Sequence, residues 1–521
     1  MKNDIYLLAI DAGTGSVRAV IFDTLGNQIE CISKEWEHLN DPRYPGSMNF
    51  DWEKNWKLTT SAIKEVLEKS KIDSSNIKAI STTCMREAIV LYDKNGKEIW
   101  ACANVDARSD NEVKQLKKNK DLEVELYKET GETFPLSAIP RLLWVKNNEP
   151  EIYKNIAHIG MINDWIIYKM SGTLKVDPSN GSTSGFFNLK NRIWDKSIAK
   201  RCNLRSDIFP EVSECGQIVS RVNQETAILT SLKKDTPIVT GGGDAQLGSI
   251  GVGIVKKDQA AIFGGSFWQY EYNTEDPIVS EKSPVRVNCH AIPNIWQYEA
   301  LAFIPGLIMR WYRDAFCELD VKVAKENKLD FYYMMDQKAK DIPAGSYGMM
   351  CTFSNIMNFL SWKHAAPSFT NFAIDSKKYN KYTFYRAILE NTAFITYGHV
   401  QLIKEVTNKE IKSVIFAGGA SKSPLWAQIL CDVLAIPLSV PVVKEATALG
   451  SAILAGVGIG IYKNLAEASK KIVKLEKTYI PNMDNHKVYM NLYKKWLKIY
   501  ENQLTLSDAD IERYMWKAPG I

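Results

Sequence analysis

The sequence predicts an α/β protein of two similar domains that face each other across a ligand-binding cleft. At 521 residues the chain is too long for one hydrophobic core, and two domains of about 250 residues each fit the usual size limits. A glycine-rich strand-turn-strand pattern occurs near the N-terminus and again about 250 residues later, and strands alternate with amphipathic helices. Since no low-complexity linker is visible, the motifs alone place the domains, at residues 1–250 and 251–521.

The first strand-turn-strand pattern joins an apolar strand at residues 6–10 to a second strand at residues 17–23. Its turn supplies glycines for close approach and hydroxyls for hydrogen bonding, at Gly13, Thr14, Gly15 and Ser16. Backbone N–H groups around such a turn form an anion-binding concavity. Asp11 can hold Mg²⁺ through water, because Mg²⁺ keeps several waters and takes one or two carboxylates. The alternative is an ordinary hairpin, and the Walker pattern is absent.

The most informative stretch is Val239–Gly248, which places Asp244 after three glycines and a short apolar strand at residues 237–240. Three glycines let the backbone turn sharply and come close to a ligand. Asp244 then stands where a substrate hydroxyl can give up its proton. The alternative interpretation is a glycine-rich turn with a capping Asp.

Two later turns complete the set. The hairpin at residues 259–269 repeats the first pattern around Gly264, Gly265 and Ser266. An apolar strand at residues 413–416 then leads into Gly418, Gly419, Ala420 and Ser421, and Ser423 and Pro424 have the pattern of an N-cap and first helical residue. A glycine turn between a strand and a helix N-terminus suits a nucleotide, although an ordinary connection explains it equally well.

In order and spacing, these four segments resemble the FGGY-type carbohydrate kinases, members of the actin and sugar-kinase superfamily. The resemblance runs nearly end to end and implies two ribonuclease H-like, actin-type domains with a catalytic cleft between them. It implies ATP and Mg²⁺ as cofactors and Asp244 as catalytic base. It assigns phosphate and ATP binding to Gly13, Thr14, Gly15, Ser16, Arg18, Gly264, Gly265, Ser266, Gly418, Gly419, Ala420 and Ser421, and Mg²⁺ to Asp11 through water. It assigns substrate binding to Arg86, Glu87, Asn104, Asp106, Gln246 and Trp268.

Four more stretches resemble a branch of this family whose acceptor is a linear dihydroxylated dione, phosphorylated on its terminal C5 hydroxyl. They are residues 84–87, 100–108, 137–144 and 516–520, of which the first three lie where substrate choice is made. Three departures from the general family pattern accompany them. Asn104 replaces a Trp of most relatives, Arg141 replaces a Lys, and Gly265 replaces the phosphate-binding Thr of glycerol kinases, so that Ser266 is the candidate for that hydroxyl.

Two other functions stay open at this point. One keeps the class and makes the protein a pentulose or polyol kinase of the xylulokinase or glycerol kinase type. The other is an ATP-driven clamp like actin or a heat-shock chaperone, which shares the phosphate hairpins but has no small-molecule pocket. Residues 85–87 and 104–108 favour the kinase, although for Arg86 and Glu87 a surface ion pair is the plainer interpretation.

Composition excludes several partners. A net charge of +5 from 65 basic and 60 acidic residues is mild, and no Lys/Arg block is interleaved with aromatics, which argues against nucleic acid. The apolar stretch at residues 452–462 is far below the ~20 residues of a membrane span and predicts a buried helix. Nine scattered cysteines without a C-x-x-C pair indicate reduced thiols, no zinc site and a cytoplasmic protein. A phosphocarrier protein of the sugar phosphotransferase system regulates some members of the resembled family and is a candidate partner.

Overall fold

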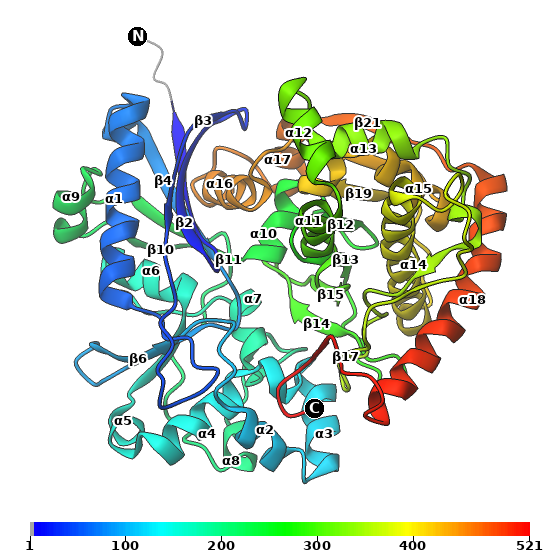
Figure 1. The fold of residues 1–521 in the computed structure, drawn as a ribbon. Helices are drawn as coiled ribbons and strands as arrows, with labels where there is room; N and C mark the ends of the chain where they lie inside the picture. Colours follow the sequence, from blue (N-terminus) through cyan, green and yellow to red (C-terminus); the bar gives the residue numbers. More distant parts are fainter. Residues whose placement is uncertain (1–4) are drawn as a thin grey trace.

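The computed structural model describes residues 5–521 and contains two mixed β-sheets that lie side by side (Figure 1). The first sheet has the order β10-β11-β4-β1-β2-β3. Its strands are β1 (Tyr6–Ala12), β2 (Ser16–Asp23), β3 (Gln28–Glu35), β4 (Ile77–Cys84), β10 (Ile218–Arg221) and β11 (Pro237–Gly243). The second sheet has the order β14-β15-β13-β12-β19-β20-β21. Its strands are β12 (Ala260–Gly264), β13 (Trp268–Thr274), β14 (Arg286–Cys289), β15 (Trp296–Leu301), β19 (Val414–Ala417), β20 (Leu438–Pro441) and β21 (Leu475–Tyr479).

The same five-strand arrangement occurs in both sheets. In the first, β1 pairs antiparallel with β2, β2 antiparallel with β3, and the β4 strand runs parallel to both β1 and β11. In the second, β12 pairs antiparallel with β13, β13 antiparallel with β15, and β19 runs parallel to both β12 and β20. The predicted pair of similar α/β domains is therefore confirmed.

Amphipathic helices cover the first sheet. On one face lie α1 (Trp52–Ser70), α6 (Ile162–Ser171) and α9 (Gln224–Thr230), with buried Ala62, Ile63 and Val66 of α1 facing the strands. A smaller sheet of β5 (Ile89–Tyr92), β6 (Glu98–Cys102) and β7 (His158–Met161) extends this part of the chain. Around it lie α2 (Asp110–Leu116), α3 (Lys120–Thr130), α4 (Ala138–Asn148), α5 (Pro150–Asn155), α7 (Pro178–Gly181) and α8 (Lys196–Arg201), and β8 (Phe187–Asn188) pairs with β9 (Ile193–Trp194).

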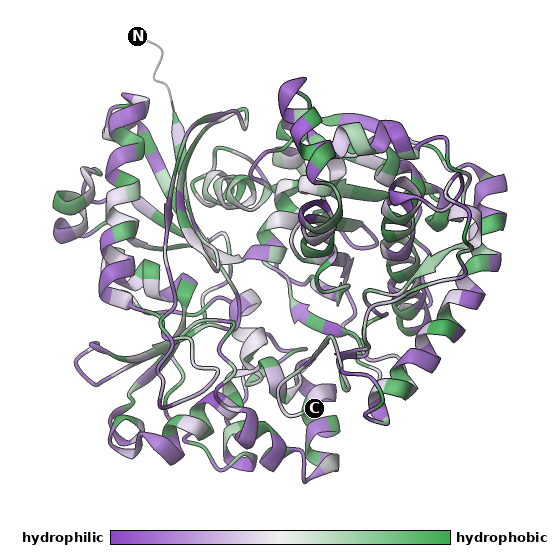
Figure 2. Ribbon diagram, viewed as in Figure 1, coloured by the Kyte–Doolittle hydropathy of each residue, from purple (hydrophilic) through white to green (hydrophobic). Residues whose placement is uncertain are grey.

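The second sheet packs against the long helix α14 (Lys381–Thr407), which is predominantly buried. Helices α15 (Pro424–Leu434) and α18 (Met483–Asp508) pack outside it, and the turns of α18 alternate between apolar and polar (Figure 2). The remaining helices are α11 (Pro305–Phe316), α12 (Glu318–Glu326), α13 (Phe331–Ala339) and α17 (Leu465–Ile472). Short strands are β16 (Met350–Cys351), β17 (Lys363–His364), β18 (Phe369–Thr370) and β22 (Trp516–Lys517). Within residues 5–521, no helix combines the length and apolar character that a bilayer crossing needs.

Two helices connect the sheets across the expected boundary at residue 250. Helix α10 (Asp244–Gly251) continues from β11, and α16 (Ala446–Gly458) returns from the second half of the chain to pack against α10, β1 and β4 (Figure 1). The prediction of a buried helix at residues 452–462 is confirmed in type, although the helix begins earlier. Since α16 lies on the first sheet, the division at 250 separates the strands of the two sheets but not their helices, and the boundary stays our proposal.

The contact between α10 and α16 is close because glycines allow it. A Cβ on Gly450 would lie 1.9 Å from the backbone oxygen of Leu247, and one on Gly251 would lie 1.9 Å from that of Ala446. Both obstructing atoms are backbone, so neither can rotate away. The two helices therefore hold a fixed separation next to Asp244.

We predict that Gly450→Ala destabilises the protein even though alanine is usually the better helix former. Overpacking a tight contact costs ~1–3 kcal/mol, and the apparent Tm in a thermal melt should fall by several degrees. Gly248→Ala is the matched control, because a Cβ at that helical position would meet only ordinary contacts at 3.5–3.6 Å. Equal melting of the two variants would contradict the role given to this contact.

Candidate active site

The turn between β1 and β2 is held by aromatic side chains that follow β3. Trp36 donates its indole N–H to the carbonyl oxygens of Gly13 and Thr14 at 3.0 and 3.1 Å, and a ring nitrogen of His38 lies 2.6 Å from the oxygen of Thr14. These contacts occupy the carbonyl groups of the turn. Thr14 and Gly15 themselves are exposed, so the turn presents its outer surface to the cleft as expected of a phosphate-binding loop.

Asp11 and Arg18 face each other across this hairpin. They are register partners, with 3.5 Å between Asp11 Oδ2 and Arg18 NH1, and the same guanidinium nitrogen lies 3.3 Å from Glu445. Burial raises the pKa of Asp11 to about 7; Arg18 lowers it, while Asp244 and Glu445 raise it further. The positive charge near Asp11 is therefore not enough to stabilise its ionised carboxylate fully.

The glycines before Asp244 are strand residues, which corrects our expectation of a sharp turn. Strand β11 runs to Gly243, three residues beyond the strand expected at residues 237–240. A Cβ on Gly241 would lie 1.5 Å from the backbone oxygen of Thr82 in β4, and one on Gly243 would lie 2.8 Å from the side chain of Arg86. Glycine is needed here because β4 and its C-terminal loop approach β11 closely.

Asp244 starts α10, and within residues 5–521 only one of its two carboxylate oxygens, Oδ1, has a hydrogen-bond partner. Arg86 donates from Nε to Asp244 Oδ1 at 3.1 Å, and the Asp244 side chain is 41% exposed while that of Arg86 is 5% exposed. Although the side chain is partly exposed, its location in the cleft removes much of its hydration and raises the pKa of Asp244, an effect that the guanidinium of Arg86 opposes. The accessible oxygen Oδ2 suits a carboxylate that accepts a proton from a ligand.

Behind Asp244 lies a buried network of ion pairs that crosses from one domain to the other. Arg86 also pairs with Glu299 of β15. Arg286 of β14 pairs with the same Glu299 at 3.0 Å, with Glu87 at 2.5 Å and with Glu132. Burial alone would raise the pKa of Glu299, but Arg86 and Arg286 hold it at about 2, whereas burial raises that of Glu132 to about 7. The plainer interpretation of Arg86 and Glu87 as a surface ion pair is therefore wrong.

Arg141 organises the segments that carry the polar groups of the pocket. This guanidinium is almost fully buried and donates to the carbonyl oxygens of Glu87, Asn104 and Asp106, the latter two at 2.8 and 3.4 Å. Glu87 has a φ of 65°, an unfavourable conformation for a non-glycine residue that the surrounding structure must maintain. Arg rather than Lys suits this position because its planar fork reaches several acceptors at once.

Asn104 and Asp106, two of the predicted substrate-binding residues, line the cavity and differ in their hydrogen-bond partners. Asn104 exchanges hydrogen bonds with the hydroxyl of Thr14 at 3.1 and 3.3 Å, which links the acceptor pocket to the phosphate turn. Asp106 is buried, and its carboxylate accepts from Arg108 and from the backbone N–H of Met48 at 2.6 Å. Asp106 therefore has few lone pairs left for a ligand.

Gln246 and Trp268 are both fully buried, but only Trp268 has its polar group hydrogen-bonded. Gln246 is fully buried on α10 and is not among the residues that line the cavity between the domains, and neither its amide oxygen nor its amide nitrogen has a partner within residues 5–521. Its assignment to substrate binding stays a prediction. Trp268 is a correction: it lies in the core, where its indole N–H donates to Thr396 at 3.0 Å and its ring stacks on Trp426. Side chains alternate along β13, so Gln269 faces the cavity instead.

The two glycine turns of the second domain meet at the ends of the parallel strands β12 and β19. Gly418 has a φ of 90°, and a Cβ there would lie 2.6 Å from the oxygen of Gly264. Gly265 and Ser266 form the exposed tip of the hairpin. Beyond Gly418, the short helix Gly419–Lys422 includes Ala420 and Ser421, whose hydroxyl donates to the Gly418 oxygen at 2.8 Å. The predicted N-cap Ser423 and first residue Pro424 of α15 are confirmed.

A cavity of about 680 Å³ lies between the domains and holds most of the predicted acceptor residues. The first domain lines it with Thr14, Arg86, Glu87, Asn104, Asp106 and Asp244. The second domain contributes Gln269, Arg286, Glu299, Phe303 and Trp362, and the segment at residues 516–521 closes one side. Sequence reasoning missed Trp36, His38, Arg286 and Glu299, which sit on strands or loops without a distinctive pattern and reach the site only through the fold.

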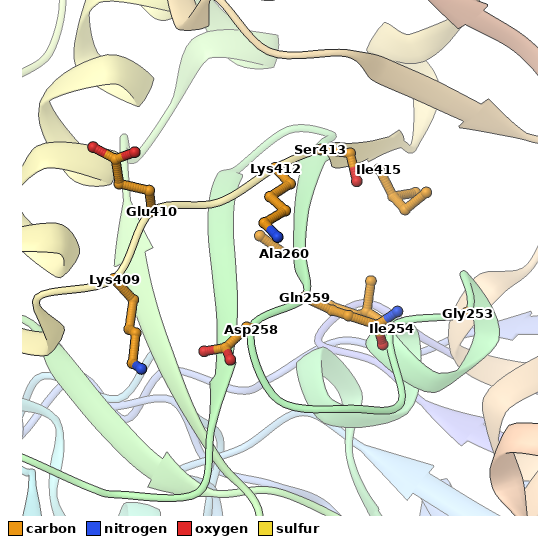
Figure 3. Close-up of a pocket in the computed structure, with 10 residues that line it drawn as sticks. All are labelled: Gly253, Ile254, Asp258, Gln259, Ala260, Lys409, Glu410, Lys412, Ser413 and Ile415. Carbon is orange, nitrogen blue, oxygen red and sulfur yellow. The ribbon is translucent and has the colours of Figure 1, made fainter.

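A second hollow of about 410 Å³ lies away from these groups (Figure 3). It is formed where β12 and β19 begin, by Asp258 and Gln259 on one segment and Lys409 and Lys412 on the other. The glycine turns lie at the opposite ends of the same two strands. We therefore assign the site to the cavity between the domains.

The residues around Asp11 fit a hydrated Mg²⁺ ion. Among the described residues, no three His, Cys, Asp or Glu side chains are arranged to enclose a metal ion, so a fully protein-bound metal is not favoured. The raised pKa of Asp11 and its proximity to Asp244 indicate excess negative charge that a cation would relieve. Mg²⁺ commonly binds through one or two carboxylates, with water and phosphate oxygens as its other ligands.

Comparisons with family models and with known sequences agree on one protein family. The model of the FGGY family of carbohydrate kinases matches residues 6–251 with its N-terminal domain and residues 265–459 with its C-terminal domain. Relatives named autoinducer-2 kinase include those of Salmonella choleraesuis and Escherichia coli K12, each 46% identical. The first match covers 99% of this chain and 98% of the relative, and the second 100% and 98%.

Solved structures confirm the fold. The gluconate kinase of Lactobacillus acidophilus superposes with a TM-score of 0.85 at 20% identity, covering 98% of this chain and 100% of that chain. A ligand-bound xylulose kinase from the same organism gives 0.84 at 20% identity, covering 97% and 100%. Plasmodium falciparum glycerol kinase with ADP gives 0.84 at 21%, covering 95% and 98%. The expected two-domain kinase fold is therefore present.

The raised pKa of Asp11 predicts a pH-dependent gain in stability for Asp11→Asn. Because the folded pKa of about 7 exceeds the ordinary 3.8, the folded state loses stability as pH rises from 4 to 7. Asparagine removes that loss, so apparent Tm in nucleotide-free, Mg²⁺-free buffer should exceed wild type at pH 8, with the gain vanishing towards pH 4. The upper limit is ~4 kcal/mol at ~1.4 kcal/mol per pKa unit.

Asp484→Asn, at a position 91% exposed, is the control and should melt like wild type at every pH. A lower Tm for Asp11→Asn at both pH 8 and pH 4 would mean that the fold needs the Asp11 charge.

Proposed function

This chain belongs to the FGGY family of carbohydrate kinases, and on that basis we propose that it is an autoinducer-2 kinase of quorum-sensing signal processing. It would transfer the γ-phosphoryl group of ATP to the C5 primary hydroxyl of linear 4,5-dihydroxy-2,3-pentanedione. The full-length identity to autoinducer-2 kinases supports the choice of acceptor.

One structural observation carries the proposal. Asp244, with one free carboxylate oxygen, lines the same cavity as Arg86, Glu87 and Asn104, and the exposed turn at Thr14 lines it too. A proton acceptor, polar groups for a hydroxylated carbonyl compound and a phosphate-binding turn therefore meet in one place. An ATP-driven clamp like actin or a heat-shock chaperone has no small-molecule pocket, so this arrangement favours the kinase.

Asp244 is the base in the mechanism. Its Oδ2 accepts the proton of the C5 hydroxyl as that oxygen attacks the γ-phosphorus, and the bond to the bridging oxygen of ADP breaks. Arg86 fixes the position of Asp244 through Oδ1 and, with Glu87, faces the hydroxyl and carbonyl oxygens of the acceptor. Phosphoryl transfer of this kind depends on positioning and charge stabilisation, not on a covalent nucleophile.

ATP would lie mainly on the second domain, with its phosphates between the turn at Gly13 and Thr14 and the joined turns at Gly264 and Gly418. Mg²⁺ held by Asp11 through water would neutralise phosphate charge when bound. The exposed tip at Gly265 and Ser266 supplies backbone N–H groups and a hydroxyl to the same space.

A pentulose or polyol kinase is the alternative, because the xylulose and glycerol kinases share this fold. Asn104 argues against it, since an amide rather than an apolar wall meets the acceptor. Cytoplasmic location, inferred from the cysteine pattern, and regulation by a phosphocarrier protein of the sugar phosphotransferase system, implied by the resemblance, stay predictions. Titration of the purified phosphocarrier protein against this chain tests the latter.

We predict that Asp244→Asn lowers kcat by ~10²–10⁴-fold, the usual worth of general-base assistance. The amide keeps the shape of the side chain and can still accept from Arg86, so ADP affinity should change little. Single-turnover phosphoryl transfer measures the chemical step. Asp258→Asn, in the hollow remote from the cavity, is the control with wild-type kcat expected. Retention of more than about a tenth of the wild-type chemical rate by Asp244→Asn would exclude Asp244 as the base.

We predict that Asn104→Trp lowers kcat/KM for the dione more than for xylulose or glycerol. The indole removes the amide and its hydrogen bonds to Thr14, and stranding a polar partner costs ~1–3 kcal/mol, or about 5- to 150-fold. Initial rates with all three acceptors give the ratio, and ADP affinity reports whether the fold is intact. An unchanged ratio would mean that Asn104 does not select the acceptor.

A further inference from the structure

Residues of the segment 516–520 line the cavity between the domains, yet the chemistry above gives this segment no role. It follows α18, and the chain then ends near α2 and α3 of the first domain (Figure 1). Trp516, Lys517, Ala518 and Pro519 all line that cavity. Asn104 and Val105, which we assign to the acceptor side of the site, line the same cavity.

On the second domain the segment is attached as a strand. Trp516 and Lys517 pair antiparallel with β17, and the N–H of Ala518 donates to the oxygen of Trp362 at 2.9 Å. The centroid of the Trp516 ring lies 4.4 Å from that of Phe303 and 4.9 Å from that of Trp362. Phe303 and Trp362 also line the cavity, so the anchor and the pocket share the same aromatic side chains.

On the first domain the segment contacts helix α2. The N–H of Gly520 donates to Asp110 Oδ1 at 2.5 Å, and Asp110 starts α2 while its other oxygen pairs with Lys114 at 2.6 Å. Gly520 has a φ of 74°, and a Cβ there would lie 2.3 Å from Cγ1 of the fully buried Val113. Any side chain at position 520 would thus move the segment away from α2.

We propose that residues 516–520 form a clasp that closes the acceptor pocket and determines affinity for the acceptor. The clasp rests on the proposed function, because it concerns the acceptor side of the same site. It is fixed to the second domain and touches the first at α2, four residues after Asp106. The clasp is seated on α2 in this structure, and an acceptor in the cavity holds it there and is thereby removed from water.

The test compares Gly520→Ala with Gly460→Ala. Gly460 has a φ of 76° but open space at its Cβ, so both variants carry the same backbone strain and only Gly520→Ala collides with α2. Gly520→Ala should raise acceptor KM about tenfold or more, with kcat within threefold and ADP affinity within twofold of wild type. Gly460→Ala should match wild type in all three. Equal acceptor KM for the two variants would overturn the clasp.

Asp110→Ala removes the partner of Gly520 from the other side. Because both changes break one contact, their effects on acceptor KM should be far from additive in the double variant. Full additivity would show two independent effects and contradict the clasp. Hydrogen exchange of the wild-type protein adds a measurement without mutation: the amides of residues 516–518 and 520 should gain protection when acceptor is added to the ADP-bound protein, and unchanged exchange would contradict the proposal.

These measurements use whichever of the dione, xylulose and glycerol the wild-type protein phosphorylates best. If that acceptor is not the dione, the proposed function fails while the clasp is still decided by the Gly520 and Gly460 pair. If the dione is phosphorylated and the two variants behave alike, the clasp alone fails.

Discussion

The buried ion pairs of Arg86 and Arg286 are the interaction on which the rest of the site depends. Charges taken out of water are tolerated only when they are paired and hydrogen-bonded. Arg86 is paired with Asp244 in one domain and Glu299 in the other, and Arg286 is paired with Glu87, Glu132 and Glu299. Arg86 Nη1 and Arg286 Nη2 have no hydrogen-bond partner within residues 5–521. The acceptor segment after β4 and the strands β14 and β15 therefore cannot separate without exposing or stranding a charge. The bond from Arg86 holds the carboxylate of Asp244 in position.

The repeated sheet explains why distant motifs meet. In each domain the glycine hairpin and the parallel strand beside it end at the same edge, so the turn at Gly264 contacts that at Gly418, although more than 150 residues separate them in sequence. Likewise β1, β4 and β11 are parallel neighbours, and their ends carry the turn at Gly13, the Arg86 segment and Asp244. Helices α10 and α16 pack together through close glycine contacts beside this edge of the first sheet.

Much of this could be predicted from sequence because it is local. The apolar strands, the glycine turns, the N-cap Ser423 and the buried helix at α16 each follow from periodicity or turn chemistry. What could not be predicted depends on neighbours that the fold brings close. Gly241 has no room for a side chain because Thr82 of β4 packs against it, and Trp268 faces the core because of strand register. Arg286 and Glu299 lie on strands with no pattern that marks them as site residues, and only the fold brings them to Arg86.

The central claim, that this site phosphorylates a linear dihydroxylated dione, is tested most directly by identifying the product. The protein would be incubated with Mg²⁺-ATP and equal concentrations of 4,5-dihydroxy-2,3-pentanedione, xylulose and glycerol, and the phosphorylated species resolved by mass spectrometry and ³¹P NMR. The account predicts that the dione phosphorylated on C5 is the main product and that ADP forms in equal amount. Phosphorylated xylulose or glycerol as the main product, or ADP released without any phosphorylated acceptor, would contradict it.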